Sequence, residues 1–393
     1  SDKCPELCGM KNFALLLLPA IALAAVSCDS GSRDVTVPPA QAALTLSDMA
    51  RIISELPMDR EHLAEVHDAV SSSSGNGYDE EYMMSDLLES PGSGVGDDRR
   101  GTRSSSYGRP LRDLLTDYLS ARMSTKSGAA DVQEYLDGLS ASDIQIYWPY
   151  SEDWDGESFP IVTFDPGLGA ESNYGYELRR SGDRLEVAGT VIVTEEIAKE
   201  RPVWVINRNS DSAFTPLELF EPSQEEAAAS SGDEAPKGRV LLLRSFKALK
   251  NFDSWFGGAS EFFIKCGAVN GFRASTDEEL KLYTPSVTDF LLVVKRSQVG
   301  YTIPLNTVLL TDFTPQMEKI ALAIMEDDGG ESKSWKCEAV VKYKSRSYGF
   351  TVDIPYRDKD DIVWRGQLSS EYLSSGRFVK DRFGETELTF ELR

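Results

Sequence analysis

The stretch "CEAVVKYKSRSYGFTVDI", residues 337–354, alternates apolar and polar side chains through two runs joined by a short polar segment. The apolar side chains gather on one face of each run: Cys337, Ala339, Val341 and Tyr343 in the first, and Tyr348, Phe350, Val352 and Ile354 in the second. A period of two is typical of a β-strand with one buried face, and "SRS" is short enough to join antiparallel strands. The stretch therefore predicts a β-hairpin.

Neighbouring stretches extend this pattern over residues 239–393. "TELTFEL", residues 386–392, places Leu388, Phe390 and Leu392 on one face and polar side chains on the other. "TPQMEKIALAIME", residues 314–326, fits a helix or a strand, and its run "ALAIM" favours a strand. Because many short alternating strands are typical of a β-sandwich, we expect a C-terminal β-sandwich domain over residues 239–393.

Three segments precede this domain. Residues 221–238, "EPSQEEAAASSGDEAPKG", are acidic and of low complexity, which favours a linker or a long loop. Residues 141–220 contain short β-rich runs such as "DIQIYW" and "RPVWVINR", which predict a small β-rich domain. Residues 46–140 are expected to be helical, because apolar residues recur at helical spacing at Leu111, Leu114, Leu115 and Tyr118. The predicted fold class is α+β, mainly β.

The N-terminal part has the layout of an export signal. "FALLLLPAIALAAV", residues 13–26, carries no charge and is shorter than the roughly 20 residues that a membrane-spanning helix needs. The following "AVSC" resembles the lipobox of bacterial lipoproteins, in which the cysteine receives a lipid. We expect residues 1–27 to be an upstream extension plus signal peptide, and residues 28–45 to be the lipidated Cys28 and a polar spacer. An ordinary secretory signal cleaved near Ser27 is the alternative.

The charge distribution bears on the class of partner. The net charge is −23, yet residues 239–393 carry 22 basic and 22 acidic side chains, so the whole excess lies before residue 239. An acidic N-terminal part disfavours binding to nucleic acid and direct adsorption to anionic lipid. It is compatible with divalent cations or basic partners.

Aromatic residues cluster in "YWPYSEDW", residues 147–154. Rings exposed beside carboxylates hold sugars by stacking and hydrogen bonding, so Tyr147, Trp148, Tyr150 and Trp154 are candidate ligand-binding residues. Exposure of Tyr147, Trp148 and Trp154 on one face would support this role. Ordinary packing at the end of a strand is the alternative.

Two groups of acidic residues are candidate metal ligands. Asp153 and Asp155 have the offsets that open a calcium loop, but Ser151 and Val162 stand where an EF-hand needs acidic side chains, so an EF-hand is excluded. The second group comprises Glu326, Asp327, Asp328, Asp358, Asp360 and Asp361. If the strands bring its two loops to one end of the sandwich, they resemble C2-type calcium loops. Solvated turns are the alternative, and no cofactor is required beyond a possible Ca²⁺.

The sequence contains little evidence for a catalytic site. His62 and His67 are five residues apart, whereas a helical zinc pair needs a spacing of four, and we expect both to be exposed on a helix. There is no Gly-x-Ser-x-Gly motif to supply a nucleophile. Cys266 and Cys337 both lie in strand-like runs, and either a disulfide or two buried free thiols would fit.

Three stretches, residues 69–88, 146–156 and 253–263, are together similar to a family of uncharacterised Bacteroidetes cell-envelope lipoproteins. The resemblance implies a lipid anchor and assigns no catalytic residue. We expect an outer-membrane location, in the periplasm or at the surface. Together with the residues above, the resemblance favours an exported, membrane-anchored binding module for a glycan or protein ligand, with Ca²⁺ as an optional cofactor. The alternative is a secreted carboxylate-dependent hydrolase such as a glycosidase.

Overall fold

The computed structural model describes residues 45–89, 107–123, 129–209, 216 and 238–393. The expectations for residues 1–27, for Cys28 and its spacer up to Leu44, and for the linker at 221–237 fall outside these ranges. Within them, no helix is both long enough and apolar enough to cross a membrane. The described residues are mainly β with several helices, which confirms the α+β class.

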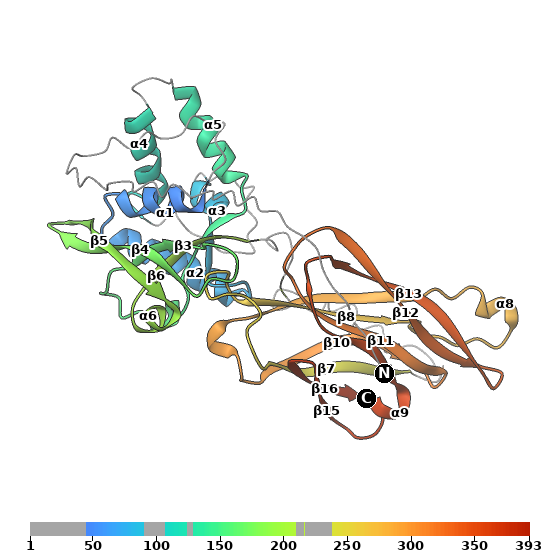
Figure 1. The fold of residues 1–393 in the computed structure, drawn as a ribbon. Helices are drawn as coiled ribbons and strands as arrows, with labels where there is room; N and C mark the ends of the chain where they lie inside the picture. Colours follow the sequence, from blue (N-terminus) through green and yellow to red (C-terminus); the bar gives the residue numbers. More distant parts are fainter. Residues whose placement is uncertain (1–44, 90–106, 124–128, 210–215, 217–237) are drawn as a thin grey trace, which may run out of the picture. The chain divides into compact units, whose positions relative to one another are not determined.

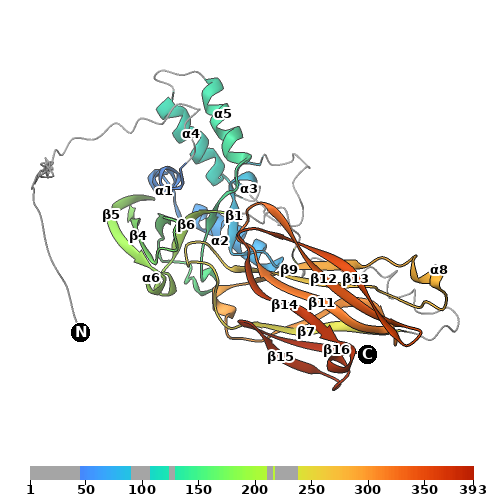
Figure 2. The ribbon, with the colours of Figure 1, turned by 45° about the vertical axis from the view of Figure 1, so that its right-hand side comes forward.

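Two sheets form the C-terminal β-sandwich (Figure 1). The first has the strand order β10 (Ile303–Phe313), β7 (Arg239–Ala248), β16 (Thr386–Leu392) and β15 (Val379–Phe383). The second has the order β13 (Arg346–Arg357), β12 (Ser332–Tyr343), β11 (Met317–Glu326), β8 (Ser260–Ala268) and β9 (Ser286–Val294). Strand β11 pairs with β12 only near its start, at Met317 and Lys319. From Lys319 to Glu326 it pairs with β14 (Asp361–Ser369) instead (Figure 2). One core joins both sheets, with Phe246 and Phe390 on one side and Ile264 and Leu322 on the other.

The expected hairpin is β12–β13, and Cys337 lies opposite Val352 in its register. Its turn is Lys344–Ser345 rather than "SRS", because pairing continues to Tyr343 and Arg346. Both turn residues have positive φ, 46° and 62°, as a tight two-residue hairpin turn requires. The ambiguous stretch before residue 326 is the strand β11, as "ALAIM" indicated.

The N-terminal part is one α/β unit. Its sheet has the order β1 (Glu81–Met83), β2 (Ile144–Tyr147), β6 (Val203–Arg208), β3 (Ile161–Phe164), β4 (Ser172–Ser181) and β5 (Arg184–Thr194). Strand β1 lies within the range expected to be helical, yet it pairs with β2 from the range expected to be a separate β domain. The two ranges therefore share one sheet instead of forming separate regions.

Helices accompany this sheet: α1 (Leu46–Glu55), α2 (Arg60–Gly75), α3 (Met84–Leu88), α4 (Leu111–Met123), α5 (Ala129–Ser140) and α6 (Glu195–Glu200). Helix α1 packs on strands β3 to β6 through Met49, Ile52 and Ile53. In α4 the predicted stripe is buried at Leu111, Leu114 and Leu115. Burying each such side chain contributes about 1.5–3 kcal/mol, which orients both helices.

The two cysteines within the described ranges are free thiols. Cys266 is buried in β8, and Cys337 is half-buried in β12. Burial raises the pKa of the Cys266 thiol to about 12. Of the two alternatives left by the sequence, the structure therefore favours free thiols.

Candidate functional site: an acidic cavity and an aromatic pocket

The loop between β7 and β8 brings the N-terminal α/β unit against the sandwich. The Asp79 carboxylate accepts hydrogen bonds from the backbone N–H of Ala259, at 2.9 Å, and of Glu80, at 2.7 Å. Arg296 pairs with Glu195 at 2.8 Å and donates to the backbone carbonyls of Asp253, Ser254 and Gly258. These contacts fix the path of residues 253–259.

Beside this loop lies a cavity of about 190 Å³ with an acidic lining. Asp79, Glu81 and Asp165 come from the N-terminal unit, and Asp253, Glu261 and Asp327 come from the sandwich. The basic residue in the lining is Arg208, whose guanidinium already pairs with Asp143. The cavity therefore holds a strong excess of negative charge.

Three carboxylates converge at its sandwich side. One oxygen from each of Asp253, Glu261 and Glu326 lies within 4.8 Å of the others. Glu326 ends strand β11, pairs in register with Phe262 and is 0% exposed. Neither of its carboxylate oxygens has a hydrogen-bond partner among the described residues.

Burial and mutual repulsion shift the pKa values of this group. Burial, followed by the negative charge of Asp253, raises the pKa of Glu326 well above its ordinary value. Burial also raises the pKa of Asp253 above its ordinary value. Both shifts mean that the site disfavours the charged form of its own carboxylates unless positive charge is supplied.

The two acidic loops predicted as calcium ligands lie together, but three of their six carboxylates stabilise the loops themselves. Asp327 pairs with Arg357 at 3.1 Å, and Asp358 accepts a hydrogen bond from the Glu331 N–H at 2.8 Å. Asp360 accepts one from the Arg357 N–H at 2.7 Å. Asp328 and Asp361 are exposed. Among the six predicted residues, Glu326 is the one that points toward Asp253 and Glu261.

Asp153 and Asp155 lie elsewhere, in the loop that follows β2. The Asp155 carboxylate accepts hydrogen bonds from the N–H groups of Glu157 and Ser158 and from the Ser158 hydroxyl. These bonds lower the pKa of Asp155 to about 2. Its oxygens therefore hold a turn, and the two residues do not join the acidic cavity.

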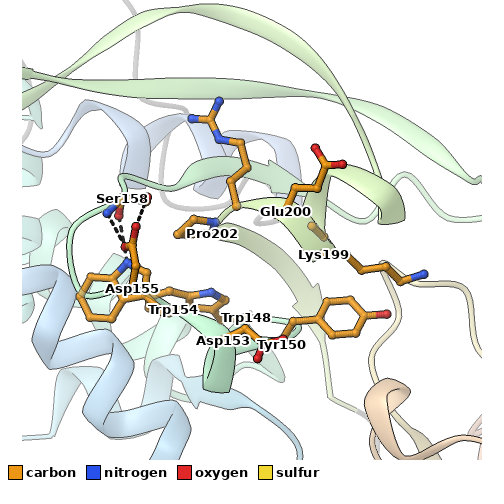
Figure 3. Close-up of a pocket in the computed structure, with 11 residues that line it drawn as sticks. Trp148, Tyr150, Asp153, Trp154, Asp155, Ser158, Lys199, Glu200 and Pro202 are labelled. Atoms are coloured by element: carbon orange, nitrogen blue, oxygen red, sulfur yellow. Dashed lines mark hydrogen bonds between the residues drawn. The ribbon is translucent and has the colours of Figure 1, made fainter.

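Three of the four predicted aromatic residues line a second cavity of about 150 Å³ (Figure 3). Tyr150 and Trp154 contribute the aromatic surface, whereas Trp148 is almost fully buried in the wall, and Pro202 lies across the pocket from the tryptophans (Figure 3). The Trp154 indole N–H donates to the Ser158 carbonyl at 3.0 Å, which fixes the ring. Asp153, Lys199 and Glu200 place charges of both signs around it.

The expected exposure of these rings is wrong for two of them. Tyr147 is 0% and Trp148 1% exposed, because β2 is an inner strand whose end is packed against other elements. Trp148 contacts Trp204 and His67, with ring centroids 5.8 and 5.5 Å apart. Tyr150 and Trp154 are half-buried and reach solvent through the pocket.

The expectation that both histidines are exposed is also wrong. His62 is 4% exposed and closes the N-terminal capping box of α2, because its Nδ1 accepts a hydrogen bond from the Asp59 backbone N–H at 3.2 Å. His67 is half-buried, and its ring centroid lies 5.0 Å from that of Trp154. Its Nε2 lies 3.2 Å from the Ser151 carbonyl oxygen. Both rings therefore have structural roles.

Sequence reasoning missed Asp253 and Glu261. The available signal was an acidic residue placed directly against a buried apolar run, as in "SEFFIKC" and "IALAIME". Charged side chains are rarely buried unless they are paired or bind a cation. Their convergence could not be predicted, because β8 and β11 are neighbours only in the folded sheet.

No family model matches the chain, and no curated protein matches it. Among solved structures, the chain is similar to one titled "Structure of Drosophila C2-DSL-EGF1", with 12% identity and a TM-score of 0.16. The match covers 39% of this chain and 65% of that one. A likeness at this TM-score carries no argument about fold or function.

Proposed function

We propose that the chain is a membrane-anchored lipoprotein of the bacterial cell envelope that binds a sugar unit of a glycan in the aromatic pocket. The observation that carries the proposal is that the half-buried rings of Tyr150 and Trp154 line one cavity together, next to the buried Trp148. Flat aromatic faces bind the apolar faces of sugar rings, while nearby charged groups accept and donate hydrogen bonds to hydroxyls.

The size of the pocket restricts the ligand. At about 150 Å³ it is smaller than the roughly 300–1,000 Å³ of pockets that enclose a drug-sized molecule. It suits one ring of a longer chain, with the rest of the glycan lying outside. Contact with a single ring implies weak affinity for each site, so we expect dissociation constants of about 0.1–1 mM.

The glycan proposal is tested on a glycan array followed by calorimetry with the best ligand. W154A removes the half-buried ring of the pocket and is expected to weaken binding at least about tenfold, a loss of about 1.4 kcal/mol. W335A is the matched control, because Trp335 is also half-buried but lies on β12. Equal binding by W154A and the wild type, or no glycan binding by the wild type, would contradict the proposal.

The anchor is tested separately. Expressed in a bacterium with labelled palmitate, the chain is expected to incorporate label and to fractionate with membranes, whereas C28A is expected to do neither. The lipobox-like "AVSC" and the apolar run before it support this proposal. Labelling of C28A at the wild-type level would exclude Cys28 as the acceptor.

A carboxylate-dependent hydrolase is the second candidate, favoured by the position of Asp253 beside Glu261 in the acidic cavity and by the raised pKa of Asp253, which burial causes. Glu326 cannot act on a glycoside, however, because it is 0% exposed. A hydrolase would therefore use Asp253 with Glu261. Turnover of chromogenic glycosides that disappears in D253N would favour this candidate, and we expect no such turnover.

A further inference from the structure

The strongest feature outside the aromatic pocket is the unpartnered carboxylate of Glu326. A fully buried carboxylate normally pairs with a cation or accepts several hydrogen bonds, since an isolated charge is very costly to bury. Glu326 is 0% exposed, and neither oxygen has a hydrogen-bond partner in the described part of the chain. Oxygens of Asp253 and Glu261 lie within 4.8 Å of one of its own, and the negative charges of Asp253, Asp328 and Asp361 repel it.

We propose that Asp253, Glu261 and Glu326 form a binding site for a hard divalent cation, and that the ion is Ca²⁺. Three anionic oxygens within 4.8 Å of one another match the spacing of ligands around one ion, since opposite oxygens on Ca²⁺ lie about 4.6–5.2 Å apart. An all-oxygen donor set selects Ca²⁺ or Mg²⁺ over zinc and copper.

The cavity accounts for the rest of the coordination shell. Ca²⁺ takes about 6–8 oxygen ligands and tolerates irregular geometry, whereas Mg²⁺ demands a near-ideal octahedron. The adjoining volume of about 190 Å³ has room for several waters that can complete the shell. Asp253 and Glu261 line that cavity, so an ion enters from it and reaches Glu326 behind them.

The ion would join three separate chain segments. Asp253 lies in the β7–β8 loop, Glu261 in β8 and Glu326 at the end of β11. Nearby basic residues do not replace it: Arg296 is engaged with Glu195 and with loop carbonyls, and Arg357 is engaged with Asp327. The site is independent of the aromatic pocket, so the Ca²⁺ proposal and the glycan proposal are tested separately.

The test is thermal melting of the purified full chain, first stripped with a chelator and then titrated with CaCl₂ or MgCl₂. A ligand that binds the folded state raises the melting temperature saturably. We expect a rise of several degrees with Ca²⁺ at about 100 times its dissociation constant, and a smaller rise with Mg²⁺ at equal concentration.

Two variants distinguish Ca²⁺ binding by the three carboxylates from a nonspecific effect of the many acidic residues nearby. E326Q keeps the shape of the side chain, removes the buried charge, and is expected to lower Ca²⁺ affinity at least about tenfold. In chelator, E326Q is expected to melt at or above the wild-type temperature, because it relieves repulsion. D361N, which removes an exposed charge directly opposite Glu326 on β14, is the control and is expected to retain affinity within a few-fold.

Three results would overturn the proposal: no saturable response of the wild type to Ca²⁺, an equal response of E326Q, or a stronger response to Mg²⁺. If E326Q fails to fold, D253N at the half-buried rim takes its place, with the same expected loss of affinity. A Ca²⁺ response that D361N and E326Q lose equally would also count against the three-carboxylate site.

Discussion

The Asp79 carboxylate of the N-terminal unit accepts a hydrogen bond from the backbone N–H of Ala259 in the sandwich, at a distance of 2.9 Å. The two residues are 180 positions apart in the chain. Because Ala259 lies between Asp253 and Glu261, this one contact ties the N-terminal unit to the loop of the acidic cavity. Asp79 is 6% exposed, so water cannot readily replace it.

Asp79→Ala is expected to destabilise the chain by about 2–4 kcal/mol, because it leaves the N–H groups of Ala259 and Glu80 buried without their acceptor. Urea unfolding followed by fluorescence measures the effect. D79N keeps one acceptor oxygen and is expected to cost less than D79A. A D79A midpoint equal to that of the wild type would show that the contact is dispensable.

Gly258→Ala is expected to destabilise the same loop. Gly258 has a φ of 134°, and an added Cβ would lie 2.9 Å from the Asp79 Oδ2. Such a backbone conformation costs a residue with a side chain about 1–3 kcal/mol. Gly257→Ala is the matched control, because its Cβ would meet the Ser254 carbonyl at 3.3 Å without a positive φ. Equal melting temperatures for the two variants would contradict this account of the loop.

Glu65 is expected to make stability depend on pH. Burial raises the pKa of Glu65 from 4.5 to about 7, although the Leu111 N–H donates to its carboxylate at 2.7 Å. Between these two values the folded state binds more protons than the unfolded state, so the free energy of unfolding falls as pH rises from about 4.5 through 7. The loss is at most about 3 kcal/mol.

Unfolding of E65Q across this pH range checks the prediction. Its stability is expected to fall less steeply with pH than that of the wild type, because the amide does not titrate. E61Q, an exposed position on the same helix, is the control. Parallel pH profiles for E65Q and the wild type would show that Glu65 does not titrate in this range.

The thiols of Cys266 and Cys337 are expected to differ in reactivity. Burial raises the pKa of Cys266 to about 12 and removes it from solvent, and the thiolate is the reactive form. In the folded chain, a thiol reagent is expected to modify Cys337 slowly and Cys266 only after unfolding. C337S leaves Cys266 as the remaining thiol of the described ranges, and mapping the modified peptides distinguishes it from Cys4, Cys8 and Cys28. Absence of both thiols until a reductant is added would instead indicate a disulfide.

The sequence predicted elements whose evidence is local. The alternation in residues 337–354 was sufficient for the hairpin β12–β13, and the spacing of Leu111, Leu114 and Leu115 was sufficient for the buried face of α4. Strand β1 was missed because a three-residue strand shows almost no period and depends on its partner β2. Pairing across the chain is set by the whole fold.

In the candidate sites too, single residues could be predicted from a local stretch, whereas their neighbours depend on the whole fold. Glu326 stood out as an acidic residue after an apolar run, but Asp253 and Glu261 join it only through the pairing of β8 with β11. Trp148 and Trp154 belong to one pocket as their proximity suggested, yet Trp148 is covered by Trp204 and His67 from distant segments. Burial of this kind cannot be deduced from a single stretch.

The most direct test of the Glu326 site is a crystal structure of the chain grown with Ca²⁺, with anomalous scattering recorded to locate the ion. The predicted result is a peak about 2.4 Å from carboxylate oxygens of Asp253, Glu261 and Glu326, with waters from the cavity completing the shell. The contradicting result is no peak, with the Glu326 and Asp253 carboxyl groups joined by a shared proton.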